Sequence, residues 1–180
     1  MANQVEAGYV RSAAHELTRP ADTTAYASGD AMANSTTAGS VTPFEFEVAR
    51  DNGGRGLIIG ADLMTNSASA FGAIRLHLFN RAPFVAGGYQ ADNAALALTY
   101  AALQTGNGVT SPKNNYIGYV DFTTFVAHSS SAVSIGTSEQ TELNFACEGD
   151  STKIYGLLEA RAAITPTSGQ LFTAILQAQG

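Results

Sequence analysis

Residues 44–64 read FEFEVARDNGGRGLIIGADLM, and this stretch decides the fold class. Its first five residues alternate between apolar and acidic, which predicts a strand with Phe44, Phe46 and Val48 on one face. The asparagine and glycines that follow predict a hairpin turn, because both residue types tolerate positive φ. Residues 57–64 then form an apolar run with the length of a buried strand. The stretch therefore indicates β structure rather than helix.

Similar strand patterns recur along the rest of the chain. Alternation within residues 116–127 places Tyr116 on one face with Val120 and Phe122, and Tyr119 on the other. Neighbouring runs are expected to pair, 57–64 with 71–79 and 154–164 with 171–177. Shorter candidates lie at 132–135 and 143–147. Short strands separated by turn residues predict an all-β fold, a jelly-roll-like antiparallel β-sandwich.

Three segments depart from the strand pattern. Residues 91–104 carry apolar side chains at helical spacing, with Asp92 as a plausible N-cap, although their spacing also fits a strand. Residues 27–42 are rich in serine, glycine, asparagine and threonine, which predicts a long surface loop. The chain before them, residues 1–26, is expected to be an extended N-terminal arm or first strand. Residues 27–180 then form one sandwich domain.

Composition excludes several classes of protein. Nine basic and 15 acidic residues give a net charge of −6, which argues against binding to nucleic acid or to an anionic membrane. Charged residues make up only 13% of the chain, against about 25% in typical soluble domains. The surface is therefore expected to be neutral and suited to packing against copies of itself or a partner. The start of the chain lacks the features of a secretory signal, so synthesis in the cytosol is predicted.

No group of residues predicts a catalytic, cofactor or metal site. His77 lies mid-strand and is expected to face solvent or an interface rather than act as a general base. Cys147 with His128 is the least implausible nucleophile and base, but a small buried cysteine is the favoured interpretation. Glu45 and Glu47 share a strand face and are interpreted as the solvated side of an edge strand. We expect no enzyme activity and no cofactor.

The order of four sequence segments resembles that of small virion proteins of tailed bacteriophages. These segments are 17–30 (LTRPADTTAYASGD), 76–79 (LHLF), 92–95 (DNAA) and 155–157 (YGL) leading to 165–172 (TPTSGQLF). The resemblance implies a head decoration, or cement, protein of the kind that is often jelly-roll-like and binds as a trimer at local three-fold positions of the shell. It carries no catalytic residues.

The expected function is thus that of a structural virion protein on the outer capsid surface, where it stabilises the shell. Its partners would be the major capsid protein and other copies of itself. Tyrosines in arm-like or loop-like segments suit a partly wet interface. The candidate interface residues are Tyr9, Val10, Arg11, Leu17, Arg19, Tyr26 and Tyr89. The alternatives are a receptor- or glycan-binding module of a phage tail or surface appendage, and a small enzyme using Cys147.

Overall fold

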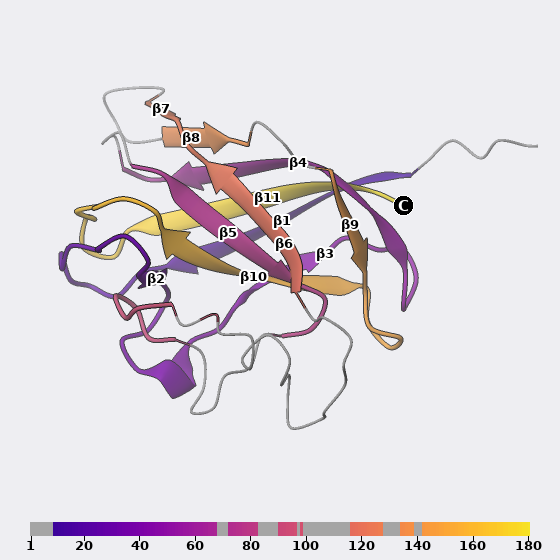
Figure 1. Ribbon diagram of the computed structural model, residues 1–180, viewed down its shortest axis with the longest axis horizontal. Coiled ribbons are helices and arrows are strands. Elements are labelled where there is room, and N and C mark those ends of the chain that lie inside the picture. Colours follow the sequence, from indigo (N-terminus) through magenta and orange to yellow (C-terminus); the bar gives the residue numbers. More distant parts are fainter. Residues whose placement is uncertain are drawn as a thin grey trace, which may run out of the picture.

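Two antiparallel β-sheets make up the computed structural model, which describes residues 9–67, 72–82, 90–96, 98, 116–127, 134–138 and 142–180 (Figure 1). One sheet has six strands: β1 (Val10–Thr18), β4 (Arg55–Thr65), β7 (Phe125–Ala127), β8 (Ser134–Thr137), β9 (Leu143–Ala146) and β11 (Leu171–Gln179). The other has five strands: β2 (Ala31–Met32), β3 (Phe44–Glu47), β5 (Ile74–Phe79), β6 (Tyr116–Phe122) and β10 (Lys153–Ala160). A short 3-10 turn spans Ala38–Ser40.

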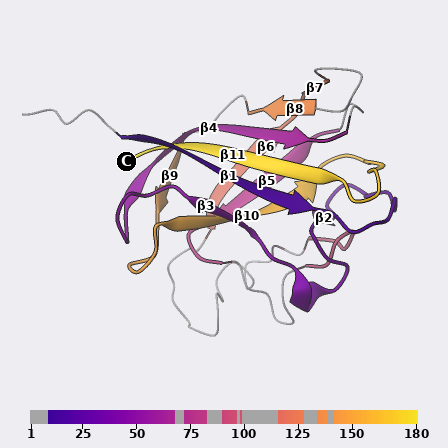
Figure 2. The ribbon, with the colours of Figure 1, turned by 180° about the vertical axis from the view of Figure 1, so that it is seen from behind.

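The central strands of each sheet come from distant parts of the chain. The six-stranded sheet has the order β1-β11-β4-β8-β7, and β9 pairs with the other end of β4. The five-stranded sheet has the order β2-β10-β5-β6, and β3 pairs with the other end of β10. Figure 2 shows β1 and β11 in front of the five-stranded sheet when the molecule is seen from behind. This arrangement confirms the predicted antiparallel β-sandwich.

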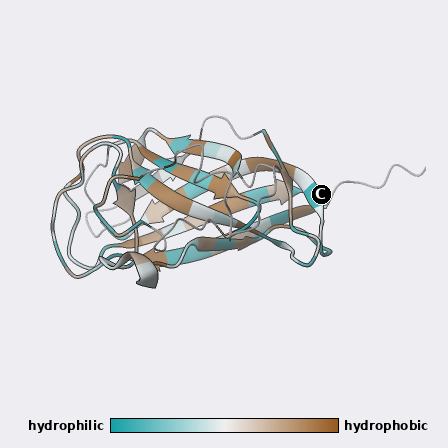
Figure 3. Ribbon diagram, turned by 60° about the horizontal axis from the view of Figure 1, so that its bottom comes forward, coloured by the Kyte–Doolittle hydropathy of each residue, from teal (hydrophilic) through white to brown (hydrophobic). Residues whose placement is uncertain are grey.

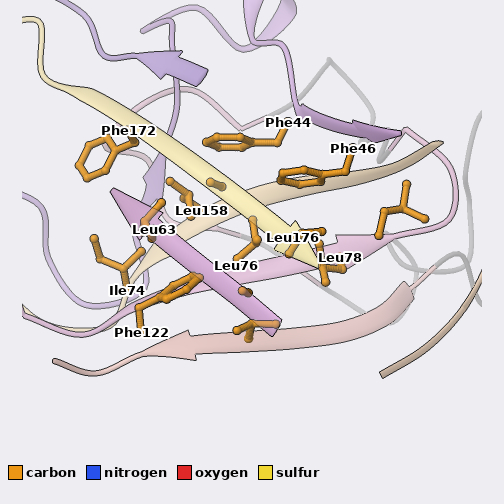
Figure 4. Close-up of a cluster of buried hydrophobic side chains, with 14 of the residues drawn as sticks. Phe44, Phe46, Leu63, Ile74, Leu76, Leu78, Phe122, Leu158, Phe172 and Leu176 are labelled. Carbon is orange, nitrogen blue, oxygen red and sulfur yellow. The ribbon is translucent and has the colours of Figure 1, made fainter. Parts of the chain in front are cut away.

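The core lies between the two sheets and is built by alternation along the strands. Figure 3 shows hydrophobic and hydrophilic segments alternating along several strands. The buried side chains of both sheets meet in one cluster, in which the rings of Phe44 and Phe46 are stacked with centroids 6.0 Å apart (Figure 4). Fully buried members of this cluster include Ile58, Leu63, Ile74, Leu76, Leu78, Phe122, Leu158, Phe172 and Leu176. Each strand that supplies one apolar face to this core leaves its other face pointing outward.

The predicted strand pairs are wrong, although the strands themselves form. β4 and β5 belong to different sheets, and so do β10 and β11. β5 pairs instead with β10 and β6, and β11 pairs with β1 and β4. Both sheets direct apolar side chains toward the same core, so the pattern of a strand shows which face is buried but not which sheet it joins.

The turn at 51–54 forms, and Gly53 adopts a φ of 71° there. It does not close a hairpin, because β3 pairs with β10 while β4 pairs with strands of the other sheet. The turn therefore carries the chain from one sheet to the other. Its positive φ still favours glycine, as the sequence indicates.

Residues 91–96 and 98 are not helical, so the predicted helix is wrong over these residues. The chain turns at Asn93, whose φ is 60°, and then runs along β2, where the Ala31 amide donates to the Ala94 carbonyl. An isolated β-bridge between Asp30 and Ala95 continues this contact. The other residues of the predicted helix lie outside the described part of the chain. Extended pairing with β2 satisfies the backbone here without helical hydrogen bonds.

The segment before residue 43 is more integrated than predicted. Val10–Thr18 pairs with β11 along its whole length and is a strand of the six-stranded sheet. Within the predicted loop, Ala31, Met32, Ala33 and Val41 are buried.

No helix among the described residues has the length and apolar character of a membrane span.

Candidate functional site

Two of the predicted interface residues are exposed at the start of β1. Tyr9 is 46% exposed and Val10 is 57% exposed. Arg11, next to them, is half-buried: its guanidinium donates to the Ala49 carbonyl at 2.7 Å and to the Glu47 carboxylate at 3.1 Å. The side chains of Tyr9 and Val10 are thus exposed, while Arg11 connects β1 to β3 and to the chain that follows β3.

Leu17, Arg19 and Tyr26 are buried inside the protein, so they are not surface anchors of the isolated chain. Arg19 and Asp92 form an ion pair with an N–O distance of 2.9 Å, and the two side chains are 0% and 1% exposed. The Tyr26 hydroxyl donates to Asp92 at 2.6 Å, and the Arg19 guanidinium lies 4.7 Å from the centre of the Tyr26 ring. Tyr89 lies outside the described residues.

This buried network has a structural role. Asp92 also accepts a hydrogen bond from the Ala33 amide at 2.8 Å, so one carboxylate joins three segments of the chain. Burial, with the neighbouring carboxylate, raises the pKa of Tyr26 above its ordinary value, and the phenol stays protonated. The network fixes the chain that follows β1 to the edge of the five-stranded sheet. The N-cap role expected for Asp92 is replaced by this contact.

Residues of three strands form what we call the open face, the outer side of the six-stranded sheet. Register brings them together in cross-strand rows: Ala14, Ile175 and Asp62 in one, and Glu16, Thr173 and Met64 in the next. The full set is Ser12, Ala14, Glu16, Asp62, Met64, Thr173, Ile175 and Gln177. All eight are exposed or half-buried, and Val126 on β7, 56% exposed, extends the same side. These eight residues include two carboxylates and no basic residue; the exposed Arg55, at the other end of β4, lies outside the set.

The outer side of the five-stranded sheet is chemically different, and we call it the ionic face. It comprises Arg75, His77 and Phe79 on β5, Tyr116, Tyr119 and Asp121 on β6, and Glu159 on β10. His77 is buried at its centre. Its Nε2 lies 2.9 Å from the Glu159 carboxylate, and its Nδ1 lies 2.9 Å from the Tyr116 hydroxyl. Arg161 then donates to the other oxygen of Glu159 at 3.0 Å.

Burial and these two contacts favour a neutral His77 with its proton on Nε2. Burial lowers the pKa of His77, and the hydrogen bond that His77 donates to Glu159 opposes this only in part. The neutral tautomer that satisfies both contacts carries its proton on Nε2, donates to Glu159 and accepts from the Tyr116 hydroxyl. Burial also raises the pKa of Tyr116 to about 12, so this hydroxyl remains a donor at neutral pH. The prediction that His77 faces solvent or an interface is therefore wrong for the chain alone.

A β-bulge in β6 places Tyr116 on the ionic face, beside His77. Leu78 pairs with Gly118 but Phe79 pairs with Tyr116, so Ile117 is the extra residue on β6. Beyond the bulge the faces exchange: Tyr116 joins Tyr119 outside, and Ile117 packs against the core. The predicted placement of Tyr116 with Val120 and Phe122 is wrong because strict alternation contains no bulge. The glycine next to Ile117 was the available signal, and Gly118 has a φ of 152°.

A cleft of about 500 Å³ opens beside β6 and the chain entering β9. It is lined by Tyr116, Gly118, Tyr119, Asp121, Thr123, Glu142 and Leu143. Arg75 holds Asp121 through two hydrogen bonds of 2.6 and 2.7 Å, and its guanidinium lies 3.7 Å from the centre of the Tyr119 ring. The hydrogen bonds lower the pKa of Asp121 and keep it ionised. Aromatic rings, hydroxyls and carboxylates thus meet at one edge of the sandwich, an arrangement suited to binding a small polar molecule.

The other predicted chemical groups have structural explanations. Cys147 is buried, as predicted, and burial raises the pKa of its thiol to about 11. Its suggested partner His128 is outside the described residues. Glu45 and Glu47 pair with Lys153 at 2.7 Å and Arg11 at 3.1 Å on the partly exposed side of β3. Within the described ranges, no three histidine, cysteine or acidic side chains gather as metal ligands.

The chain matches no model of a known protein family, and a search of the curated proteins finds no similar sequence.

Proposed function

We propose that this chain is a structural virion protein that binds the outside of a phage capsid and stabilises it. The observation that carries the proposal is the open face. Six of its eight side chains are uncharged, so a partner can cover this face at little cost of burying charge. The resemblance of four sequence segments to phage decoration proteins supports the same function.

The charges of the open face favour a partner other than a second open face. Glu16 and Asp62 are its only ionisable residues, and two such faces packed together would bring carboxylates toward one another. A neutral or weakly basic capsid surface avoids this repulsion. We place the exposed Tyr9 and Val10 at the rim of the same contact, because they lead into β1. Assembly as a trimer would multiply the weak affinity of each copy.

A single-charge substitution tests the proposal. Thr173→Arg introduces a long cation at the centre of the open face, and should lower occupancy on capsids that lack this protein by at least about tenfold. Thr36→Arg is the matched control, because Thr36 is exposed on the loop that precedes the 3-10 turn. Both variants should retain the wild-type melting temperature. Equal capsid occupancy for wild type and Thr173→Arg would remove the open face from the mechanism.

Two further measurements address the remaining parts of the proposal. Light scattering on a sizing column should give a mass near three times 18.6 kDa if the free protein is a trimer. Quantitative protein analysis of purified particles gives the copy number. Hundreds of copies fit a decoration protein, whereas a handful would favour the receptor- or glycan-binding appendage.

A further inference from the structure

The cleft beside β6 is distinct from the open face, because none of the eight residues of the open face lines it. Its walls come from β6 and from Glu142 and Leu143, where the chain enters β9. Its volume of about 500 Å³ lies within the range of small-molecule sites. A Cβ at Gly118 would lie 3.0 Å from the Leu143 side chain, so the glycine allows the two walls to approach closely.

Tyr119 provides an aromatic platform in this cleft. The residue is 48% exposed even though Arg75 is stacked on its ring. Arg75 is itself fixed by its two hydrogen bonds to Asp121. A planar guanidinium held in this way restrains the ring above it before any ligand arrives. The platform is therefore preorganised rather than a free surface tyrosine.

The polar groups around the platform mainly accept hydrogen bonds. Tyr116 lines the cleft, and in the neutral tautomer of His77 its hydroxyl donates to His77, so its oxygen can still accept a hydrogen bond. Glu142 is exposed and forms no ion pair with any described residue. Thr123 adds a hydroxyl that can donate or accept. A fitting ligand must bring several hydrogen-bond donors of its own.

The charge on the platform selects against a cationic ligand. An aromatic ring attracts a cation to its face, but one face of the Tyr119 ring already holds the Arg75 guanidinium. A second cation on the free face would be repelled across the ring. An electrically neutral surface of C–H groups meets no such repulsion and gains the same apolar contact. A sugar ring meets both requirements: it has a neutral C–H face for the Tyr119 ring and hydroxyl groups that donate hydrogen bonds.

We propose that this cleft binds a neutral pyranose unit, free or within a polysaccharide, with one C–H face of the sugar on Tyr119. Hydroxyls of the sugar donate to Glu142 and to the Tyr116 oxygen. The His77–Glu159 pair is a positioning element that orients the Tyr116 hydroxyl and does not contact the sugar.

Ligand-observed saturation-transfer NMR tests this proposal, with lactose, maltose, cellobiose and N,N′-diacetylchitobiose as free probes and choline as the cationic probe. The chain has seven tyrosines and no tryptophan, so its tyrosine fluorescence gives an independent titration. At least one neutral sugar should bind, and Tyr119→Ala should weaken it about tenfold or more. Tyr119→Phe should retain most of the affinity. Glu142→Gln should weaken binding less than Tyr119→Ala does.

Tyr9→Ala is the matched control, because Tyr9 has nearly the same exposure as Tyr119 and directly precedes β1 of the other sheet. It should leave sugar binding unchanged. Unaltered melting curves show that each variant is folded. Failure of the wild-type protein to bind any of the four sugars or cell-wall polysaccharide, equal losses in Tyr9→Ala and Tyr119→Ala, or binding of choline in place of the sugars would each overturn the proposal. Binding to cell-wall polysaccharide but to no free disaccharide, if abolished by Tyr119→Ala, would support it with an extended glycan as ligand.

Discussion

The outer sides of the two sheets differ in how they use the few charges of this chain. On the ionic face, Arg75 pairs with Asp121, and His77 and Arg161 both pair with Glu159. On the open face, Glu16 and Asp62 stand among short neutral side chains, and no ion pair among the described residues joins two strands of the six-stranded sheet. The ionic face pairs its charged groups within the fold, whereas the two carboxylates of the open face form no ion pair with any described residue.

This difference predicts that stability and partner binding depend on opposite sides of the sandwich. Substitutions that break ion pairs of the five-stranded sheet should lower the free energy of unfolding. Substitutions on the open face should leave it nearly unchanged and act on assembly. The following four predictions test that division.

The largest loss is expected for Asp92→Ala, at the edge of the five-stranded sheet. Removing this carboxylate leaves the Arg19 guanidinium, the Tyr26 hydroxyl and the Ala33 amide without their buried acceptor. The free energy of unfolding should fall by about 3–5 kcal/mol, measured by urea denaturation. Asp150→Ala, an exposed acidic residue in a turn, is the control and should change it by less than about 0.5 kcal/mol. Similar values for both variants would show that the Arg19 network contributes little.

Glu159→Ala should have the next largest effect. It deprives the buried His77 Nε2–H of its acceptor and leaves Arg161 unpaired. We expect a loss of about 2–3 kcal/mol in the free energy of unfolding. Glu16→Ala on the open face removes the same charge from an exposed strand position, so it serves as the comparison. If Glu16→Ala were the more destabilising variant, the assignment of the two faces would be reversed.

Lowering the pH should lower the free energy of unfolding, because His77 is buried in the ionic face. Because burial lowers the pKa of folded His77 below its unfolded value of about 6.5, the unfolded chain takes up a proton that the folded chain does not. The contribution is fully present above about pH 6.5 and is lost as pH falls toward the folded pKa, with a slope of up to about 1.4 kcal/mol per pH unit. His77→Gln should abolish this part of the slope between about pH 7.5 and 5. Parallel pH profiles for wild type and His77→Gln would contradict the prediction.

The smallest effect on stability is expected on the open face itself. Asp62→Asn retains the size of the side chain and removes a charge that pairs with no described residue. The free energy of unfolding should change by less than about 0.5 kcal/mol. Combined with Glu16→Gln, it should make capsid binding less dependent on salt concentration if the capsid surface opposite is basic. A loss of stability above about 1 kcal/mol would mean that the fold itself requires these charges.

Much of the fold was predictable from local patterns. The alternation of Phe44, Phe46 and Val48 placed them in the core, and the two glutamates between them lie outside, as predicted. The apolar Phe145 and Ala146 that precede Cys147, with the frequent burial of free cysteine, identified it as buried. These predictions succeed because neighbouring side chains of a strand point to opposite faces, a property that needs no knowledge of the partner strand.

The candidate site was much less predictable. Tyr26 and Arg19 looked like surface anchors because the residues around them are polar, yet Asp92, far away in the chain, receives both of them in the interior. His77 looked accessible because the sequence does not show that Glu159 faces it from β10. An ionisable group can be buried only when its partner arrives at the same place, and that depends on contacts distant in sequence.

The sequence by itself therefore determined the all-β class, the strands and the inward face of most of them, since these depend on the local period of apolar residues. Tertiary structure alone decided which strands pair and how the outer sides of the sheets differ. It also placed the bulge at Ile117, which moves Tyr116 to the outer side of its sheet. Strands of both sheets bury similar apolar faces in one shared core, so local hydrophobicity cannot distinguish between partners. Strand register and long-range ion pairs determine which strands pair, and both form only when the two sheets assemble.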